Sequence, residues 1–368
     1  MKVAIVHDYI KEYGGAERVL EALSEIFPEA PIYTAFCDKN STAYERFKNR
    51  KIVQSWAARI PFFPKLASPL RFLTPFVWGS FNFSDFDLVV SSASWYVTKG
   101  FGSRQSTHNK PIEICYCHTP PRWLYGFNTS VNFQKFLIVR LYAKIVGSFI
   151  RYYDFKRAQK VNYFIANSKE VQARIKKFYQ RDSSVIYPPV SLPVVGNVAR
   201  QDYYFIVSRI VGAKGLDLAV EAAVKDGFNL KIAGSPAGYH FEHEKLLKKS
   251  NGKVEFLGQV TDEELAKLYK GAKAFLALAK DEDFGITPVE AMLSGTPVIA
   301  FNGGGYKETV INGKTGVLFD DYSSNGLIEA IKSFEKTKID SNDCIEQAQK
   351  FSKERFKKEI KEVIEKYA

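Results

Sequence analysis

The chain has 368 residues, of which 46% are hydrophobic and 25% charged, and its formal net charge at pH 7 is +12. This length predicts two folded domains, and the composition excludes disordered, collagen-like and small disulfide-scaffold proteins. The longest uncharged run, residues 183–199, contains three prolines, so we expect no segment that spans a membrane.

Short β-branched runs alternate with helical periodicity along almost the whole chain. The predicted strands of the first part are Val3–His7, Asp87–Ser92, Ile112–His118, Asn162–Asn167 and Ser184–Tyr187. Those of the second part are Tyr203–Ser208, Leu230–Ala233, Val254–Leu257, Ala274–Ala279, Val298–Phe301 and Gly316–Phe319. The helical patterns between them include Ala16–Ile26, Glu170–Phe178, Leu216–Val224, Glu263–Lys270 and Val289–Leu293. Several strands are apolar on both faces, as parallel strands covered by helices are, so the pattern predicts two doubly wound α/β domains.

The domain boundaries follow from proline content and helical pattern. A proline-rich segment, residues 188–201, is the predicted linker between an N-terminal domain of residues 1–187 and a C-terminal domain of residues 202–349. Residues 350–368 have the pattern of a charged amphipathic helix, which we expect to return to the N-terminal domain. Ligands of doubly wound sheets bind at the carboxyl ends of the strands. The two domains are therefore expected to face a central cleft, with the chemistry in the loops that follow the strands.

Two glycine clusters follow predicted strands, where backbone N–H groups can meet an anion. Gly14 and Gly15 open a predicted helix, whose N-terminus presents free N–H groups and a positive dipole end to phosphate. A plain turn is the alternative interpretation of this pair. Residues 303–305 are all glycine and form a second nest of backbone amides suited to phosphate.

Two cations and two carboxylates lie after strands of the second domain. Arg209 and Lys214 follow the strand Tyr203–Ser208 and can reach one diphosphate, with solvated surface cations as the alternative. Glu282 is predicted in a loop after a strand, and Glu290 in the first turn of the next helix. Ionised carboxylates accept hydrogen bonds from sugar hydroxyls, although Glu290 alone also suits a helix-capping acid.

His118 ends the apolar strand Ile112–His118 and precedes two prolines, at the edge of the sheet where ligands bind. A structural histidine is the alternative interpretation. The sequence contains no Ser-His-Asp order, nucleophile elbow, P-loop or dinucleotide-type GxGxxG. Hydrolase, kinase and dehydrogenase functions are therefore disfavoured.

Taken together, these motifs resemble the retaining glycosyltransferases of family 4, which have the GT-B fold. The segments most typical of that family are Phe256–Gln259, Asp283–Met292 and Gly316–Phe319. The opening segment, residues 6–19, and the stretch Tyr116–Arg122 look like the WbaZ-like mannosyltransferase branch. The resemblance extends over nearly the whole chain.

The resemblance implies a nucleotide-diphosphate sugar donor that is held mainly by the second domain. Glu290 would bind the ribose hydroxyls and Glu282 the transferred sugar, while Arg209 and Lys214 would neutralise the diphosphate. His118 would contact the transferred sugar near its reacting centre. The residues thereby assigned to catalysis are His118, Arg209, Lys214 and Glu282, and those assigned to the donor are Gly14, Gly15, Arg209, Lys214, Glu282, Phe284, Gly285, Ile286, Glu290 and Gly304. Such enzymes need no metal, so no metal or other cofactor is expected.

The reaction that this resemblance implies is transfer of mannose from GDP-mannose, with retention of configuration, to a hydroxyl of a lipid-linked or polysaccharide acceptor. A donor sugar on UDP, or epimerisation instead of transfer, is compatible with the same fold. A non-catalytic, membrane-associated protein that binds nucleotide sugars is the alternative from another class.

The positive charge is concentrated in the first half. Residues 1–190 carry 27 basic and 14 acidic side chains, whereas residues 191–368 carry 25 and 26. The aromatic-rich stretch Trp56–Phe81 contains no acid, and none occurs between Glu113 and Asp154, where apolar residues recur at helical spacing. This pattern predicts contact with an anionic membrane surface; a core-facing helix with a basic solvated face is the alternative, and nucleic acid is disfavoured.

The four cysteines form no plausible disulfide framework, which indicates a reducing compartment. We therefore expect a cytoplasmic protein that is peripheral on the inner face of the cell membrane.

Overall fold

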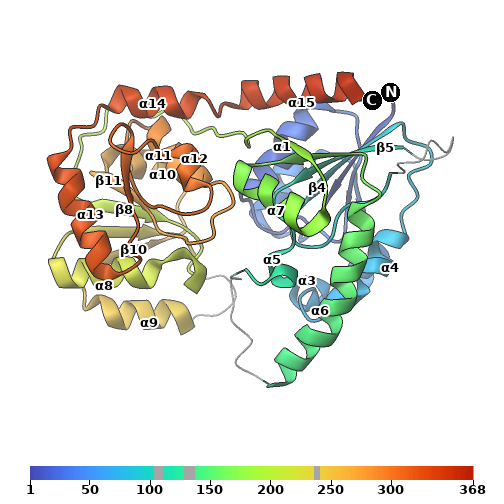
Figure 1. Cartoon of the computed structure of the whole chain (residues 1–368), viewed down its shortest axis with the longest axis horizontal. Coiled ribbons are helices and arrows are strands. Elements are labelled where there is room, and N and C mark those ends of the chain that lie inside the picture. The colour runs from blue at the N-terminus through green and yellow to red at the C-terminus, as the bar shows by residue number, and fades with distance from the viewer. Residues whose placement is uncertain (103–110, 128–136, 236–240, 368) are drawn as a thin grey trace. The chain divides into compact units, whose positions relative to one another are not determined.

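The computed structural model describes residues 1–102, 111–127, 137–235 and 241–367. The described residues form two compact units, each built around one parallel sheet with helices beside it (Figure 1). Unit 1 contains the described residues within 1–189 and 353–367, and unit 2 contains those within 190–352. The prediction of two doubly wound α/β domains is confirmed; that their sheet edges face a common cleft stays a prediction.

The described part of unit 1 contains a seven-stranded sheet in the order β3-β2-β1-β4-β5-β6-β7. Its strands are β1 Val3–His7, β2 Ile32–Thr34, β3 Ile52–Gln54, β4 Leu88–Ala93, β5 Ile112–Cys117, β6 Tyr163–Ala166 and β7 Ser183–Val185. Every neighbouring pair is parallel. The strand order reverses between β1 and β4, and ligands of such sheets bind beyond the carboxyl ends of the strands at this switch point.

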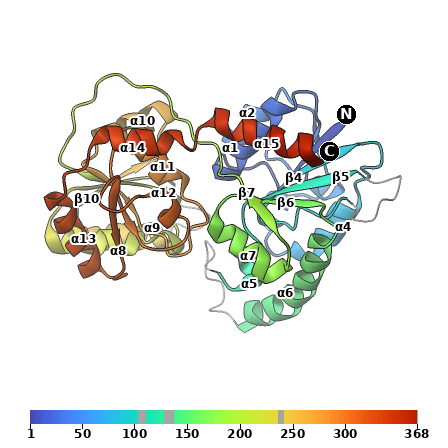
Figure 2. The ribbon, with the colours of Figure 1, turned by 45° about the horizontal axis from the view of Figure 1, so that its top comes forward.

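The helices of unit 1 include one from the far end of the sequence. They are α1 Gly15–Ile26, α2 Thr42–Phe47, α3 Phe63–Leu66, α4 Thr74–Gly79, α5 Arg122–Tyr125, α6 Leu137–Ala158, α7 Lys169–Tyr179 and α15 Lys353–Tyr367, with short 3-10 helices at Trp56–Arg59 and Arg71–Leu73. Helix α15 lies along α1 (Figure 2) and buries Phe356, Ile360 and Ile364 in the core that also contains Leu20 and Leu23. The last helix thus completes the core of the first unit.

The described part of unit 2 contains a six-stranded parallel sheet in the order β10-β9-β8-β11-β12-β13. Its strands are β8 Tyr204–Val207, β9 Leu230–Ala233, β10 Val254–Gly258, β11 Ala274–Ala277, β12 Val298–Phe301 and β13 Gly316–Phe319. Its helices are α8 Leu216–Asp226, α9 Phe241–Ser250, α10 Asp262–Gly271, α11 Ile286–Leu293, α12 Tyr306–Thr309, α13 Ser324–Lys336 and α14 Ser341–Gln349, with a 3-10 helix at Gly212–Lys214. The switch point of this sheet lies between β8 and β11.

Most of the proline-rich segment is held by unit 2. The Val190 N–H donates to the Phe351 carbonyl at 2.9 Å, and the Arg200 guanidinium donates to the Gly295 carbonyl at 2.9 Å. Residues 190–201 therefore belong to the second unit, and the chain passes from one unit to the other after residue 189 and again after residue 352.

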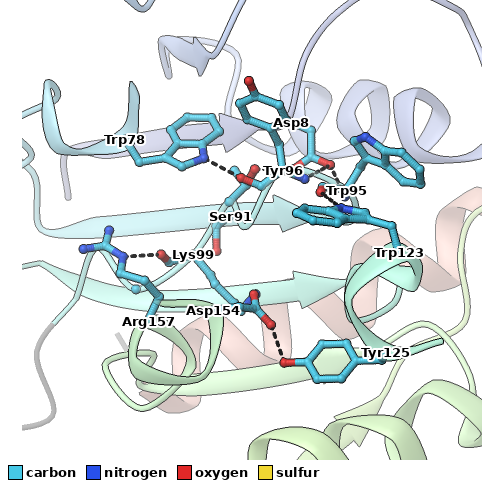
Figure 3. Close-up of polar contacts among 12 residues, drawn as sticks. Asp8, Trp78, Ser91, Trp95, Tyr96, Lys99, Trp123, Tyr125, Asp154 and Arg157 are labelled. Atoms are coloured by element: carbon cyan, nitrogen blue, oxygen red, sulfur yellow. Dashed lines mark hydrogen bonds and ion pairs between the residues drawn. The ribbon is translucent and has the colours of Figure 1, made fainter. Parts of the chain in front are cut away.

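The connection that leaves β4 is fixed by a buried carboxylate next to the end of β1 (Figure 3). Asp8 accepts hydrogen bonds from the backbone N–H groups of Trp95 and Tyr96 and from the Thr98 hydroxyl. From the other side, the Trp78 indole N–H donates to the Tyr96 carbonyl at 2.7 Å. Because a buried carboxylate is stable only when it is hydrogen-bonded, Asp8 fixes this loop against β1.

The same connection is anchored further along by a buried ion pair. Lys99 pairs with Asp154 of α6, and both side chains are almost completely buried. The Tyr125 hydroxyl donates to Asp154 Oδ2 at 2.7 Å, and Arg157 Nε donates to the Lys99 carbonyl at 2.9 Å (Figure 3). Removing either charged partner would leave the other buried without compensation, so this pair is expected to be structural.

Candidate functional site

A charged pair lies at the switch point of unit 2. Lys214 ends the 3-10 helix that follows β8, and Glu282 lies in the loop that follows β11. Lys214 Nζ donates to Glu282 Oε2 at 2.7 Å, although the residues are 68 positions apart in the sequence. The side chains keep 29% and 16% of their exposure, so both are accessible to a ligand at the carboxyl edge of the sheet. The fold thus brings two of the predicted site residues into contact.

A glycine sets the distance between the β8 loop and β11. Gly215 has φ +72°, and a Cβ at this position would lie 2.5 Å from the Leu278 carbonyl oxygen. The Tyr322 hydroxyl donates to that same carbonyl at 2.9 Å. Only glycine combines this left-handed conformation with such a close backbone approach, which brings Lys214 next to the loop of Glu282.

The glycines of residues 303–305 pack directly on the backbone of the Glu282 loop. Gly304 has φ +52°, and a Cβ there would lie 2.2 Å from the Glu282 carbonyl oxygen. The Gly305 N–H donates to that carbonyl at 2.9 Å, and the Gly303 N–H donates to the Phe301 carbonyl at 2.8 Å. This loop therefore holds Glu282 in place. The N–H groups of Gly303 and Gly305, which we expected to face a phosphate, instead donate hydrogen bonds to carbonyl groups of the protein.

Glu290 is buried, with 2% exposure, and its Oε2 accepts a hydrogen bond from the Tyr269 hydroxyl at 2.8 Å. Helix α11 begins at Ile286, three residues earlier than the periodicity predicts, so Glu290 lies in the second turn and not in the first. The early start is made possible by Gly285, whose φ of +90° lets the chain enter the helix beside the Tyr306 ring. The sequence did not predict that Tyr269, which lies 21 positions before Glu290, would be its hydrogen-bond partner.

The other residues predicted to bind the donor differ in exposure. Arg209 follows β8 and is exposed, whereas Ile286 is half-buried. The Phe284 side chain is buried, with its ring centroid 5.3 Å from that of Phe351. Phe284 therefore belongs to the core of unit 2, and its side chain fixes the loop that carries Glu282.

Sequence reasoning missed Tyr306, which directly follows the glycine loop and begins α12. Its hydroxyl lies 3.5 Å from Glu282 Oε2, and burial together with the Glu282 charge raises the pKa of Tyr306. The phenol therefore stays protonated and can donate a hydrogen bond beside the Lys214–Glu282 pair. An aromatic residue with a hydroxyl directly after a glycine loop at a strand end was the available signal.

A polar cluster of different character lies at the switch point of unit 1. His118 directly follows β5, and its Nε2 lies 2.8 Å from Ser92 Oγ in β4. The same hydroxyl oxygen lies 3.0 Å from Nδ1 of His7, the last residue of β1. His7 Nε2 lies 3.5 Å from Oε1 of Glu17 in the first turn of α1. Three neighbouring strands and the helix after the first of them thus supply one continuous polar chain.

This cluster is buried, and its histidine at the end of β5, His118, is neutral. His118 and His7 have exposures of 8% and 2%. Burial, together with the neighbouring His7, lowers the pKa of His118 to about 3. Protonated imidazole is disfavoured in this setting because the site removes it from water. His118 is therefore a hydrogen-bonding group at neutral pH and not a cation.

The glycine pair lies where the sequence predicts, at the start of α1. Gly14 is the residue before the helix, and its N–H donates to Glu17 Oε2 at 3.0 Å. Sequence reasoning singled out Gly14, Gly15 and His118 but missed His7, Ser92 and Glu17. The signal was present for two of them, because His7 and Ser92 are polar residues at the carboxyl ends of otherwise apolar strands.

Three general features concern the described part of the chain. There, no group of three or more His, Cys, Asp or Glu side chains is arranged to hold a metal ion. All four cysteines are free thiols. No helix there has both the length and the apolar composition that crossing a bilayer requires.

The family comparison concerns unit 2. Residues 193–351 match the family model described as "Glycosyl transferases group 1". This segment of the chain is therefore similar to that family. The matched segment contains Arg209, Lys214, Glu282 and Glu290, so the charged pair at the switch point of unit 2 lies within the matched residues.

Relatives with curated names include several glycosyltransferases. The chain is 27% identical over 205 residues to the uncharacterized glycosyltransferase MJ1178 of Methanocaldococcus jannaschii, a match that covers 55% of this chain and 58% of that protein. It is 26% identical over 373 residues to the alpha-1,3/1,6-mannosyltransferase ALG2 of Candida glabrata, covering 85% and 78%. It is 31% identical over 204 residues to the O-antigen chain mannosyltransferase RfbU of Salmonella typhimurium, covering 52% and 56%. The match to the first relative thus spans less than two thirds of that protein.

Solved structures support the architecture. The chain is similar to Anabaena HepE in complex with UDP and glucose, with a TM-score of 0.71, 18% identity and coverage of 99% of both chains. At this identity the likeness shows the fold alone, two α/β domains that are each built on a parallel sheet. The narrower assignment to family 4 and to its mannosyltransferase branch stays a prediction.

Proposed function

We propose that this protein is a GT-B glycosyltransferase that moves a sugar from a nucleotide-diphosphate donor to an acceptor hydroxyl. The observation that carries the proposal is the accessible Lys214–Glu282 pair at the switch point of unit 2, within the segment that is similar to glycosyl transferases group 1. A lysine supplies charge to a diphosphate, and a carboxylate accepts hydrogen bonds from sugar hydroxyls. When a donor binds, Lys214 and Glu282 can give up their contact with each other, and Lys214 can then contact the diphosphate while Glu282 contacts the sugar hydroxyls.

The proposed chemistry is transfer with retained configuration. The bond between the anomeric carbon and the leaving phosphate oxygen breaks, and the acceptor oxygen bonds to the anomeric carbon on the same face. The acceptor proton passes to a phosphate oxygen of the leaving diphosphate. Lys214 and Arg209 stabilise the negative charge that develops on that diphosphate, which is a transition-state effect. Glu282 and Glu290 orient the sugar and the ribose, and no step uses a metal.

The proposed donor is GDP-mannose. The names of two relatives, ALG2 and RfbU, are those of mannosyltransferases, which favours mannose as the transferred sugar. A UDP-sugar is the second candidate, because the similar HepE structure contains UDP and glucose.

The donor proposal is tested by thermal denaturation and ligand-observed NMR with GDP-mannose, UDP-glucose, GDP and UDP. We expect one nucleotide sugar to raise the melting temperature of the wild type and to lose most of its effect on Lys214→Ala. The control is Lys231→Ala, which breaks a lysine–carboxylate pair of 3.1 Å elsewhere in unit 2. Absence of binding by every nucleotide sugar, or equal losses in both variants, would refute the proposal.

Helix α6 has an exposed apolar face, which suggests where an acceptor could be met. Its large exposed residues recur along one side of the helix: Leu137, Leu141, Ile145, Phe149 and Tyr152. The residues that pack toward unit 1 are others, with Ile150 fully buried and Val146 partly buried. Helix α6 is thus apolar on two faces, and the core-facing interpretation accounts for only one of them.

A second exposed apolar region lies on the segment that packs against α6. Its members are Trp56, Phe62, Leu66, Phe72 and Phe76. Trp56 and Phe76 of this region, together with Leu73, line an open groove of about 540 Å³. The Tyr142 hydroxyl of α6 donates to the Pro69 carbonyl, which joins the two regions into one surface, and α3, α4 and α6 lie together in Figure 1.

The charge around this surface, which we call the α6 surface, is positive. Exposed cations on it include Arg59, Lys65, Arg140 and Lys144. The sequence has no acid in residues 46–84 or 114–153. Apolar side chains surrounded by cations, with no compensating acid, match an anionic bilayer better than a neutral protein surface. We therefore propose that the α6 surface lies on the inner face of the cell membrane, where the enzyme meets a lipid-linked acceptor.

Flotation with liposomes tests this part separately from the chemistry. We expect the wild type to float at low salt with phosphatidylglycerol-containing vesicles and not with pure phosphatidylcholine. The double variant Leu141→Glu and Ile145→Glu should lose most of this binding, because two charges then enter the lipid-facing side of α6. The control, Leu247→Glu, alters an exposed leucine on α9 of unit 2 and should still float. Failure of the wild type to float, or equal loss in the control, would exclude the membrane contact.

A further inference from the structure

We propose that a hydrogen-bond chain in unit 1 fixes which ring nitrogen of His118 carries the proton. The chain runs, in order, through Glu17, His7, Ser92 and His118, with a charge contact between Glu17 and His7 and hydrogen bonds from His7 to Ser92 and from Ser92 to His118. With His7 in its neutral form, Nε2 of His118 is the protonated nitrogen in this chain, and Nδ1 presents a lone pair. The three other members are positioning residues, and the consequence for catalysis rests on the proposed glycosyl transfer.

The direction of the chain is set at its carboxylate end. Glu17 Oε2 accepts the Gly14 N–H at 3.0 Å, and Oε1 lies 3.5 Å from His7 Nε2. A carboxylate oxygen at this distance attracts the imidazole proton to the nitrogen that faces it. When His7 is in its neutral form, which carries a single N–H, its other nitrogen, Nδ1, is then an acceptor; a doubly protonated His7 would donate to Ser92 and reverse the chain.

Ser92 passes this direction to the second histidine. Its hydroxyl oxygen lies 3.0 Å from His7 Nδ1 and 2.8 Å from His118 Nε2. The hydroxyl has a single proton, which it donates to the acceptor nitrogen of His7. Its oxygen can then only accept from His118, so the proton of His118 lies on Nε2.

The surroundings leave His118 no alternative to the neutral ring. It is buried, and its pKa is lowered to about 3, so protonation of both nitrogens does not occur near neutral pH. The Tyr116 ring packs edge-on against it at 5.2 Å between centroids. The nearby carboxylate of Asp8 is occupied by the loop after β4 and does not compete with Glu17 for the histidines.

The consequence is a choice of ligand at Nδ1 of His118. A lone pair there accepts a hydrogen bond from a hydroxyl and repels a phosphate or carboxylate oxygen, which can only accept. The reverse tautomer would accommodate those anions. The inference therefore assigns His118 to a hydroxyl of the sugar or acceptor and excludes it as an anion ligand.

Nitrogen NMR on the free, uniformly ¹⁵N-labelled full chain tests this inference without any assay of transfer. The sequence has five histidines, and His118→Gln identifies the His118 signals by their loss. We expect the shifts of an unprotonated Nδ1 and a protonated Nε2 in the wild type. The opposite pattern, or rapid averaging between the two nitrogens, would overturn the inference.

Two serines of β4 provide a matched pair of variants. Ser92→Ala removes the link, so the His118 shifts should move toward a mixture of tautomers. Ser91→Ala also removes a buried hydroxyl from the same strand, but that hydroxyl donates to Glu113 at 2.7 Å and does not touch His118. Equal shifts in both variants would indicate a general structural effect and refute the chain. If the wild type keeps the proton on Nε2 of His118 but transfers no sugar, the hydrogen-bond chain is supported and the proposed function is refuted.

Discussion

The two sheets end in edges of opposite character. At the switch point of unit 1, imidazoles and a hydroxyl form a buried chain in which His118 is neutral. At the switch point of unit 2, an ammonium and a carboxylate form a pair that remains partly exposed. Both edges use residues from strands that are neighbours in space and distant in sequence. The shared architecture therefore carries two kinds of polar site.

The difference has a physical cause. Charged groups lose much hydration when they are buried, so a charge that must meet a ligand is best kept near water and held by a replaceable partner. Hydrogen bonds between uncharged groups, such as the Ser92 hydroxyl and the His118 ring, tolerate burial because each donor has an acceptor. We expect changes in unit 2 to affect chemistry more than folding, and changes at His118 to show themselves in the dependence of stability on pH.

The largest effect is expected for Lys214→Ala. Loss of a cation that stabilises developing phosphate charge should lower kcat/KM by several hundred-fold, or about 3.5 kcal/mol of transition-state stabilisation. The melting temperature should change little, because partly exposed ion pairs contribute about 0–1 kcal/mol to stability. Steady-state kinetics with the donor found by binding measures the first quantity, and thermal denaturation measures the second.

A contradicting result would be that Lys214→Ala destabilises unit 2 strongly, while the fraction of the variant that stays folded has the kcat/KM of the wild type. In that case the Lys214–Glu282 pair is a structural bridge. Lys231→Ala, the matched control, should keep near-normal kinetics because its pair with Glu255 lies away from the switch point.

The glycine loop is expected to give a smaller effect, on stability. In Gly304→Ala the new Cβ would lie 2.2 Å from the Glu282 carbonyl oxygen, so the loop must move. Gly313→Ala is the control, because Gly313 also has a positive φ, +77°, but has open space around it. We expect Gly304→Ala to cost about 2 kcal/mol more than the control in urea denaturation, and to weaken donor binding as Glu282 shifts. Equal costs would show that the glycine is needed for its backbone conformation alone.

An effect of similar size is expected for the pH dependence of unit 1. The folded pKa of His118 is about 3 and its ordinary value is 6.5, so the unfolded chain binds a proton below pH 6.5 that the folded chain does not. Stability due to this group is therefore fully present above pH 6.5 and is lost as the pH falls toward 3. At pH 5 the loss is about 2 kcal/mol. Urea denaturation at pH 7.5 and pH 5 should show this slope in the wild type and a weaker slope in His118→Gln.

Much of the fold can be read from local sequence. Strands such as Val3–His7 and Val298–Phe301 were predicted with the bounds that the structure has, because each is a compact β-branched run. β2 and β3 were missed: each has three residues, and their strand conformation comes from pairing with β1 and with each other. Such short segments contain too little periodicity to be recognised alone.

The face that a helix buries was less predictable. The sequence between Glu113 and Asp154 shows apolar residues at helical spacing, which suggests one apolar face. Tertiary packing divides those residues, burying Ile150 and exposing Ile145 and Phe149 on the opposite side of α6. Periodicity records that a residue is apolar, but not which neighbour covers it.

The sequence by itself determined the residue types at the ends of the strands: the glycines before α1 and α12, the histidine after β5, and the cations and carboxylates after β8 and β11. Those features depend on local backbone geometry and on chemistry within a few residues. Only the tertiary structure decided that Lys214 meets Glu282, that Tyr269 binds Glu290, and that Ser92 joins two histidines. Such partners are selected by the order of strands in a sheet, and this order is set by the packing of the whole domain.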